Sequence, residues 1–146
     1  ELHLVGNINN CYEYFKPYNI LFNKKIFIYG KLDRCRAFQA MKEADILVNI
    51  GNDFPYQLPS KIVEYGSLGK PILNIAKIAE DSSAAFLKDY PASLCLRGDS
   101  FGVDSEQFAN LIQFIEKLPS VDSSKLNLWL KLYCIKSISD TYKFLF

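Results

Sequence analysis

Five short apolar runs recur along this chain, and longer, more polar segments separate them. The runs span residues 2–5, 26–29, 46–50, 72–75 and 93–96. Each is bounded by Gly, Asn, Asp or Pro, and most are rich in β-branched or aromatic side chains, which is typical of strands. Strands that alternate with helices indicate a parallel sheet covered by helices on both faces. The predicted fold class is therefore α/β, with a Rossmann-like parallel sheet.

The first helix is predicted after the second apolar run. Asp33 can cap its start, because a side-chain oxygen at this position accepts from a free amide of the first turn. The spacing of Ala37, Phe38 and Met41 places these side chains on one face of the helix. The helix is expected to end near Ala44.

A second helix is predicted to begin at Ser60, after the third apolar run. It must stop at Gly69, because glycine suits the left-handed position that follows a helix. Pro71 cannot continue a helix, and it is expected to open the next strand.

Two more helices are predicted in the last third of the chain. Asp104 and Gln107 resemble a capping box, and an amphipathic pattern follows them. Its apolar positions are Phe108, Leu111, Ile112 and Ile115. Residues 123–146 repeat the helical period, with a break expected near Ser137. Their aromatic end is expected to pack on this domain or on a missing one, since it is costly to leave in water.

The net charge argues against some classes of binding partner. With 17 basic and 16 acidic side chains the net charge is +1, too small a field to hold nucleic acid or an anionic membrane. The 146 residues fit a single domain without an internal linker. No run of about 18 apolar residues occurs in the sequence, so no segment is expected to span a bilayer. Glu1 opens directly onto an apolar run without a signal-peptide head, so the chain is expected to be part of a longer protein.

The residues that most often hold metals are sparse. The four cysteines, which form no Cys-x-x-Cys pair, are Cys11, Cys35, Cys95 and Cys134. This spacing argues against a zinc site. Three of them are expected to be small buried side chains. The absence of a disulfide pattern favours a reducing, cytoplasmic setting for the protein. The only histidine, His3, is predicted to be a packed strand residue. No glycine-rich nucleotide fingerprint occurs either, so no cofactor and no metal are predicted.

An aromatic cluster near the amino end has two interpretations. It consists of Tyr12, Tyr14, Phe15 and Tyr18, with Lys16 among them. Such side chains could stack on bases. Core packing of a helix, or an interface with a missing domain, is the favoured interpretation.

Ligands of open parallel sheets bind beyond the carboxyl ends of the strands. Two segments lie there, residues 30–33 and the long turn 51–58 that leads into the helix at Ser60. Free amides at Ser60 and Lys61, together with the positive end of the helix dipole, could form a binding site for a diphosphate. The alternative is that Ser60 only caps the helix and that the Lys61 side chain is solvated.

Glu64 lies one turn beyond Ser60, on the same side of the helix. A carboxylate at this place can accept two hydrogen bonds from a vicinal diol such as a ribose. The alternative is an ordinary surface glutamate that the helix dipole favours.

Three neighbouring stretches carry a resemblance to a known family. They are Ala-Asp-Ile-Leu-Val-Asn-Ile-Gly-Asn at 44–52, Gln-Leu-Pro-Ser-Lys-Ile-Val-Glu-Tyr at 57–65 and Gly-Lys-Pro-Ile-Leu at 69–73. Together they resemble the donor-binding domain of GT-B glycosyltransferases, specifically the retaining, group 1 type family of bacterial surface-polysaccharide synthesis. Residues 26–31 look like the strand and glycine before that family's base-binding loop, and residues 88–96 look like its last strand. The resemblance covers about residues 1–118.

The resemblance implies roles for individual residues. Glu64 would hold the ribose hydroxyls, the amides near Ser60 and Lys61 would meet the donor phosphates, and the turn before them would line the donor sugar. The implied nucleotide-sugar-binding residues are Gly30, Lys31, Tyr56, Gln57, Leu58, Pro59, Ser60, Lys61 and Glu64, with Gly30 and Lys31 bordering the base. No catalytic residue is assigned.

One departure from the family concerns the donor sugar. Many members carry two glutamates separated by seven residues, and counting back from Glu64 reaches Tyr56 instead of an acid. Asp53 and Gln57, on the same turn, are the candidates to replace that acid.

The resemblance implies that residues 1–146 form one half of a two-domain hexosyltransferase. The complete enzyme would move a sugar from a nucleoside-diphosphate donor to a glycan or lipid-linked acceptor, in capsule or other surface-polysaccharide synthesis. It would be cytoplasmic, at the inner face of the cell membrane through the missing amino-terminal acceptor domain. This chain alone is expected to bind a nucleotide poorly and to transfer nothing.

The family also places a basic strand and loop before the equivalent of residues 2–5. In the strand order 3-2-1-4-5-6 that absent strand is the central one. The remaining sheet is therefore expected to close a gap or to borrow a partner.

Two other functions are compatible with the fold class. The first is a non-catalytic α/β interaction domain within a polysaccharide-synthesis complex, which Tyr56 in place of an acid favours. The second is a sugar-nucleotide epimerase, which is disfavoured because no acid and base pair is visible.

Overall fold

The structure is a computed structural model that describes residues 1–98 and 105–133. Asp104, Cys134, the expected break near Ser137 and the aromatic end of the chain lie outside the described residues. The chain divides into a first unit, Glu1–Glu43, and a second unit, Ala44–Phe146, and each is described by itself.

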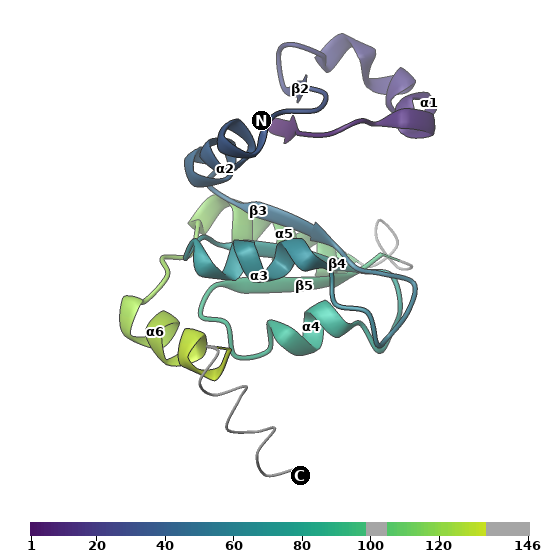
Figure 1. Ribbon diagram of the computed structural model, residues 1–146. Coiled ribbons are helices and arrows are strands. Elements are labelled where there is room, and N and C mark those ends of the chain that lie inside the picture. Colours follow the sequence, from purple (N-terminus) through teal and green to yellow (C-terminus); the bar gives the residue numbers. More distant parts are fainter. Residues whose placement is uncertain (99–104, 134–146) are drawn as a thin grey trace. The chain divides into compact units, whose positions relative to one another are not determined.

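The first unit holds a two-stranded parallel sheet. Strand β1 (Leu2–Leu4) pairs with β2 (Ile26–Ile28), so that Leu2 lies opposite Ile26. Three short helical segments connect the strands: η1 (Asn9–Cys11), α1 (Tyr12–Phe15) and η2 (Lys16–Leu21). Helix α2 (Arg34–Glu43) follows β2 (Figure 1). As predicted, Asp33 caps α2, because its Oδ1 accepts from the Arg36 amide at 2.9 Å.

The expectation that the aromatic cluster packs in the core of a helix is wrong for its three tyrosines. Tyr12, Tyr14 and Tyr18 are all exposed, Tyr14 at 79% of its surface. The physical reason is the short local structure, since helical segments of four and six residues have no long continuous face to bury. Only Phe15 is partly buried.

The expectation of buried cysteines is also wrong. Cys11, Cys35 and Cys95 are all exposed, although apolar residues flank them in sequence. His3 lies in a strand, as predicted, but on an open face. Its ring stacks on Phe27 at 5.0 Å and on Tyr29 at 5.7 Å.

The second unit is built on a three-stranded parallel sheet in the order β3-β4-β5. The strands are β3 (Leu47–Ile50), β4 (Ile72–Ala76) and β5 (Ser93–Arg97). Helix α3 (Ser60–Ser67) joins β3 to β4, and α4 (Ser82–Phe86) joins β4 to β5. Helices α5 (Ser105–Lys117) and α6 (Ser123–Leu132) follow. Figure 1 shows α3 and α5 on opposite faces of this sheet. The predicted α/β class is therefore confirmed, with Rossmann-like βαβ units.

The pairing of the strands can be compared with the gap expected where the central strand of the order 3-2-1-4-5-6 is absent. All five predicted strands form, each within one residue of its expected bounds, but they make two separate sheets. The observed pairs, β1 with β2 and β3-β4-β5, are those that the order 3-2-1-4-5-6 leaves when its first strand is removed. Among the described strands, those of one sheet pair with none of the other.

The second helix ends where the sequence predicts. Gly69 has a φ of 62°, the left-handed conformation that glycine adopts at low cost, and its amide donates to the Gly66 carbonyl. Helix α4 was not predicted, because five residues are too few to show a helical period. Asp81 caps α4 by accepting from the Ala84 amide at 2.7 Å.

The core of the second unit lies between the sheet, α3 and α6. It is formed by the buried side chains of Ile62, Ile72, Leu87, Tyr90, Ala92 and Trp129. The Trp129 ring packs edge-on against Phe86 and Tyr90, with ring centres 5.0 Å apart in both cases. It also lies directly over Gly66, where an added Cβ would come within 2.5 Å of the ring. Helix α6 can approach α3 this closely only because residue 66 has no side chain.

We predict that Gly66→Ala lowers the free energy of unfolding by about 1–3 kcal/mol, because the methyl group overpacks the Trp129 contact. Helix propensity alone would raise stability by up to about 1 kcal/mol. Urea denaturation followed by circular dichroism measures the change. Val63→Ala, at an exposed position of the same helix, is the control. In a Trp129→Leu background the loss should disappear, and unchanged or raised stability of the single variant would contradict the contact.

A second prediction concerns alkaline pH. Burial raises the pKa of Tyr90 to about 12, and its hydroxyl donates to the Lys70 carbonyl at 2.8 Å. The folded state therefore favours the neutral phenol, and this stabilisation is complete below pH 10 and is lost as the pH rises toward 12. The stability advantage of the wild type over Tyr90→Phe, measured by urea denaturation, should shrink between pH 9 and pH 12. An advantage that grows over this range would show that the tyrosine carries no raised pKa.

Candidate functional site

The loop of residues 51–59 runs from the carboxyl end of β3 to the start of α3. Its first residue, Gly51, is buried, whereas Tyr56, Gln57 and Leu58 are exposed, Tyr56 at 83% of its surface. The Tyr56 ring stacks on Phe54 with ring centres 5.7 Å apart. The three residues implied to line a donor sugar thus lie on the surface, at the edge of the sheet where ligands of this fold class bind.

The start of α3 has free backbone donors. Pro59 precedes the helix in an extended conformation, with φ −60° and ψ 128°, and no side chain caps the helix start. Ser60 is the first helical residue, so the alternative in which it caps the helix is not observed. Across residues 1–98 and 105–133, the amides of Ser60 and Lys61 donate to no other group. Such amides, with the positive end of the helix dipole, attract anions.

Glu64 and Lys61 lie together on the outer side of α3. The Lys61 Nζ donates to Glu64 Oε2 at 2.8 Å, and both side chains are accessible, Glu64 at 40%. Ile62, on the opposite side of the helix, is fully buried. The carboxylate therefore faces solvent instead of the hydrophobic interior, one turn from the free amides.

Gly30 and Lys31 belong to the first unit, directly after β2. Gly30 has a φ of 65°, and its carbonyl accepts from the Gly6 amide at 2.7 Å. Lys31 is exposed. The other implied binding residues all belong to the second unit.

The loop of residues 51–59 is held by its neighbours. The Gln57 carbonyl accepts two hydrogen bonds, from Asn52 Nδ2 and from Ser82 Oγ, each at 2.8 Å. Asp53 pairs with Lys77, with Nζ and Oδ1 2.7 Å apart. Of the two candidates for the missing acid, Asp53 is therefore occupied by an ion pair, and the side chain of Gln57 is exposed.

Sequence reasoning missed a buried polar network beneath this loop. Asn49 and Asn74 lie opposite each other on β3 and β4, and Asn49 Nδ2 donates to Asn74 Oδ1 at 2.7 Å. Asn74 Nδ2 in turn donates to Asp81 Oδ1 at 3.0 Å. The signal was present, because an asparagine interrupts each of two apolar strand runs, and a buried amide needs a partner.

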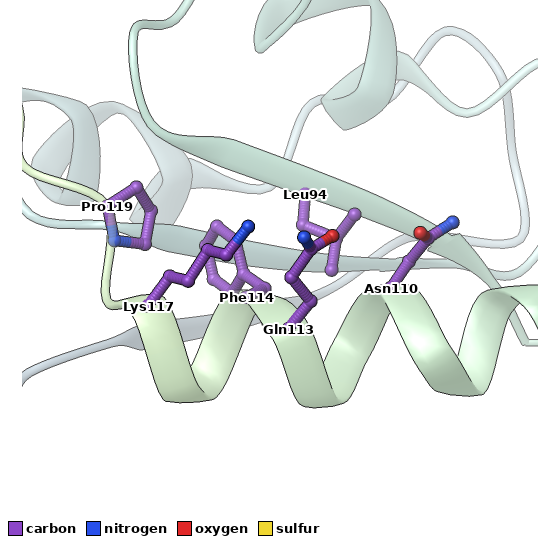
Figure 2. A pocket seen from close by; sticks show the side chains of 6 residues that line it. All are labelled: Leu94, Asn110, Gln113, Phe114, Lys117 and Pro119. Atoms are coloured by element: carbon purple, nitrogen blue, oxygen red, sulfur yellow. The ribbon is translucent and has the colours of Figure 1, made fainter.

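A hollow of about 320 Å³ lies elsewhere, between β5 and α5 (Figure 2). Leu94 and Phe114 give it an apolar surface, with Asn110, Gln113, Lys117 and Pro119 around them. None of these residues belongs to the predicted site, which is an open surface at the edge of the sheet.

Residues 1–98 and 105–133 contain neither a cluster of metal-binding side chains nor a membrane-spanning helix. No three or more His, Cys, Asp and Glu side chains gather there in a way that could hold a metal ion. None of the described helices is long and apolar enough to cross a membrane.

Comparisons with models of protein families, with curated proteins and with solved structures give no match for this chain.

We predict that Glu64→Gln changes the free energy of unfolding by no more than about 0.5 kcal/mol, because exposed ion pairs contribute little to stability. Lys61→Gln, which removes the other partner, should behave in the same way. Urea denaturation of both variants measures the effect. A loss of about 1.5 kcal/mol or more would mean that the pair serves the fold, which would remove the reason to assign it to a ligand.

Proposed function

We propose that this chain is the donor-binding, carboxyl-terminal domain of a retaining GT-B glycosyltransferase of the group 1 type. The complete enzyme transfers a sugar from a nucleoside-diphosphate-sugar to a glycan or lipid-linked acceptor, in bacterial capsule or other surface-polysaccharide synthesis. One observation carries the proposal: the start of α3 offers free amides and an exposed carboxylate on adjacent turns, at the carboxyl edge of the sheet.

The geometry suits a nucleoside diphosphate. The amides of Ser60 and Lys61 donate to the phosphate oxygens, and the Lys61 ammonium adds a positive charge. Glu64 accepts hydrogen bonds from the two ribose hydroxyls. These bonds replace part of its interaction with Lys61. In this arrangement the loop of residues 51–59 lies next to the donor sugar.

The chemical step follows from the charge that develops during the reaction. When the bond between the sugar and the diphosphate breaks, negative charge grows on the leaving phosphate oxygens. Helix-start amides that already point at this group stabilise the transition state more than the ground state. The attacking hydroxyl group belongs to the acceptor molecule, which the other domain of the complete enzyme binds, and its proton passes to the leaving diphosphate.

A second candidate function is a non-catalytic interaction domain within a polysaccharide-synthesis complex. It is favoured by large apolar side chains left exposed on β3 and α5. They are Val48, Ile50, Phe108, Ile112 and Ile115. Assays of donor hydrolysis and of sugar transfer with the full-length protein separate the two functions, because an interaction domain shows neither activity.

We predict that Glu64→Ala weakens the binding of a nucleoside diphosphate by about 10- to 100-fold, the usual effect of losing hydrogen bonds to a charged group. Calorimetric titration of the full-length protein with UDP, GDP and dTDP measures the affinities. Glu116→Ala, at an exposed glutamate of α5, is the matched control and should bind as the wild type does. Wild-type affinity in Glu64→Ala would overturn the ribose role.

A further inference from the structure

The segment that leads from β4 into the first residue of α4 touches the candidate donor loop at three places. Asp81 lies against Gly51, Ser82 donates to Gln57, and Lys77 pairs with Asp53. The sequence alone had pointed to none of Lys77, Asp81 and Ser82. Because β3 and β4 are adjacent and parallel, their following loops meet at one edge of the sheet.

Asp81 is fixed at the base of the donor loop. It is 3% exposed, and its Oδ1 accepts both from Asn74 Nδ2 at 3.0 Å and from the Ala84 amide at 2.7 Å. Its Oδ2 is buried and faces Gly51, where an added Cβ would lie only 2.0 Å from that oxygen. The carboxylate therefore occupies the space that a side chain at residue 51 would fill, and the two loops fit together at this point.

Ser82 extends the same contact to the far end of the loop. Its hydroxyl donates to the Gln57 carbonyl, the group that Asn52 Nδ2 also contacts. Asn52 belongs to the loop itself, whereas Ser82 comes from the next βα connection, so of the two hydrogen bonds to the Gln57 carbonyl only the one from Ser82 joins the loop to another segment. Gln57 lies between Tyr56 and Leu58, the two other residues implied to line the donor sugar.

We propose that Ser82, placed by the Asn49–Asn74–Asp81 network, is a positioning residue for the donor-sugar loop. It acts through the Gln57 carbonyl and touches no substrate. This role in donor selection rests on the proposed donor-binding function. It implies that Ser82 contributes to the recognition of the sugar, and that the diphosphate and ribose contacts on α3 do not depend on it.

The first arm of the test needs no ligand. Chymotrypsin cleaves after aromatic residues, and the Tyr56–Gln57 bond lies in the exposed loop. In Ser82→Ala, cleavage at this bond should become about fivefold faster, the effect expected from one lost hydrogen bond. Ser82→Thr, which keeps the hydroxyl, should return the rate to the wild-type value. Cleavage after Tyr14, exposed in the first unit, is the internal reference, and mass spectrometry quantifies both fragments.

The second arm compares the affinities of the same variants for a nucleoside diphosphate and for the corresponding sugar nucleotide. Ser82→Ala should bind UDP or GDP as the wild type does, but should lose about fivefold in affinity for UDP-glucose or GDP-mannose, whichever pair the wild type binds. Ser82→Thr should restore the affinity for the sugar nucleotide. A merely destabilised variant would lose affinity for both ligands together, which would overturn the positioning role.

The outcomes separate the two proposals. An unchanged cleavage rate in Ser82→Ala overturns the positioning role, whatever the protein binds. A faster rate in a protein that binds no nucleotide supports the loop contact and overturns the donor-binding function. A faster rate with equal affinity changes for diphosphate and sugar nucleotide overturns the part of Ser82 in sugar recognition.

Discussion

A series of hydrogen bonds between three buried side chains joins the parts of the second unit that form the candidate site. They are Asn49 on β3, Asn74 on β4, and Asp81, which caps α4. A buried polar group without a partner costs about 1–3 kcal/mol, so each member of the series constrains the next. The register of β3 against β4 therefore determines where Asp81 lies, and Asp81 determines how closely the donor loop can approach at Gly51.

Local signals in the sequence were sufficient to predict most of the fold. Apolar runs bounded by turn residues identified all five strands, and the pair of Gly69 and Pro71 identified the end of α3. The short helical segments between β1 and β2 and the five-residue helix α4 were missed because none of them is long enough to show a period. Exposure of the cysteines and tyrosines was misjudged for another reason. Burial depends on which distant segment covers a residue, and flanking residues do not determine that.

Only the part of the candidate site that lies on helix α3 could be predicted from the sequence. Ser60, Lys61 and Glu64 lie within five residues, so helical geometry alone places their amides and side chains on one turn. The contacts that hold the neighbouring loop join residues 25 apart, such as Ser82 and Gln57, and they depend on the pairing of two strands. Each asparagine in an apolar run was the available signal, because it required a buried polar partner that the sequence did not identify.

The most direct test of nucleotide binding at the start of α3 is an amide NMR titration of this chain with UDP and with GDP, since it detects even weak binding. The amide resonances of Ser60 and Lys61 are predicted to show the largest shifts and to saturate, and in Glu64→Ala the same shifts should require about 10- to 100-fold more nucleotide. The absence of shifts at both amides with either diphosphate at millimolar concentration would contradict the assignment. Shifts centred on Leu94 and Phe114, at the hollow beside α5, would contradict it equally.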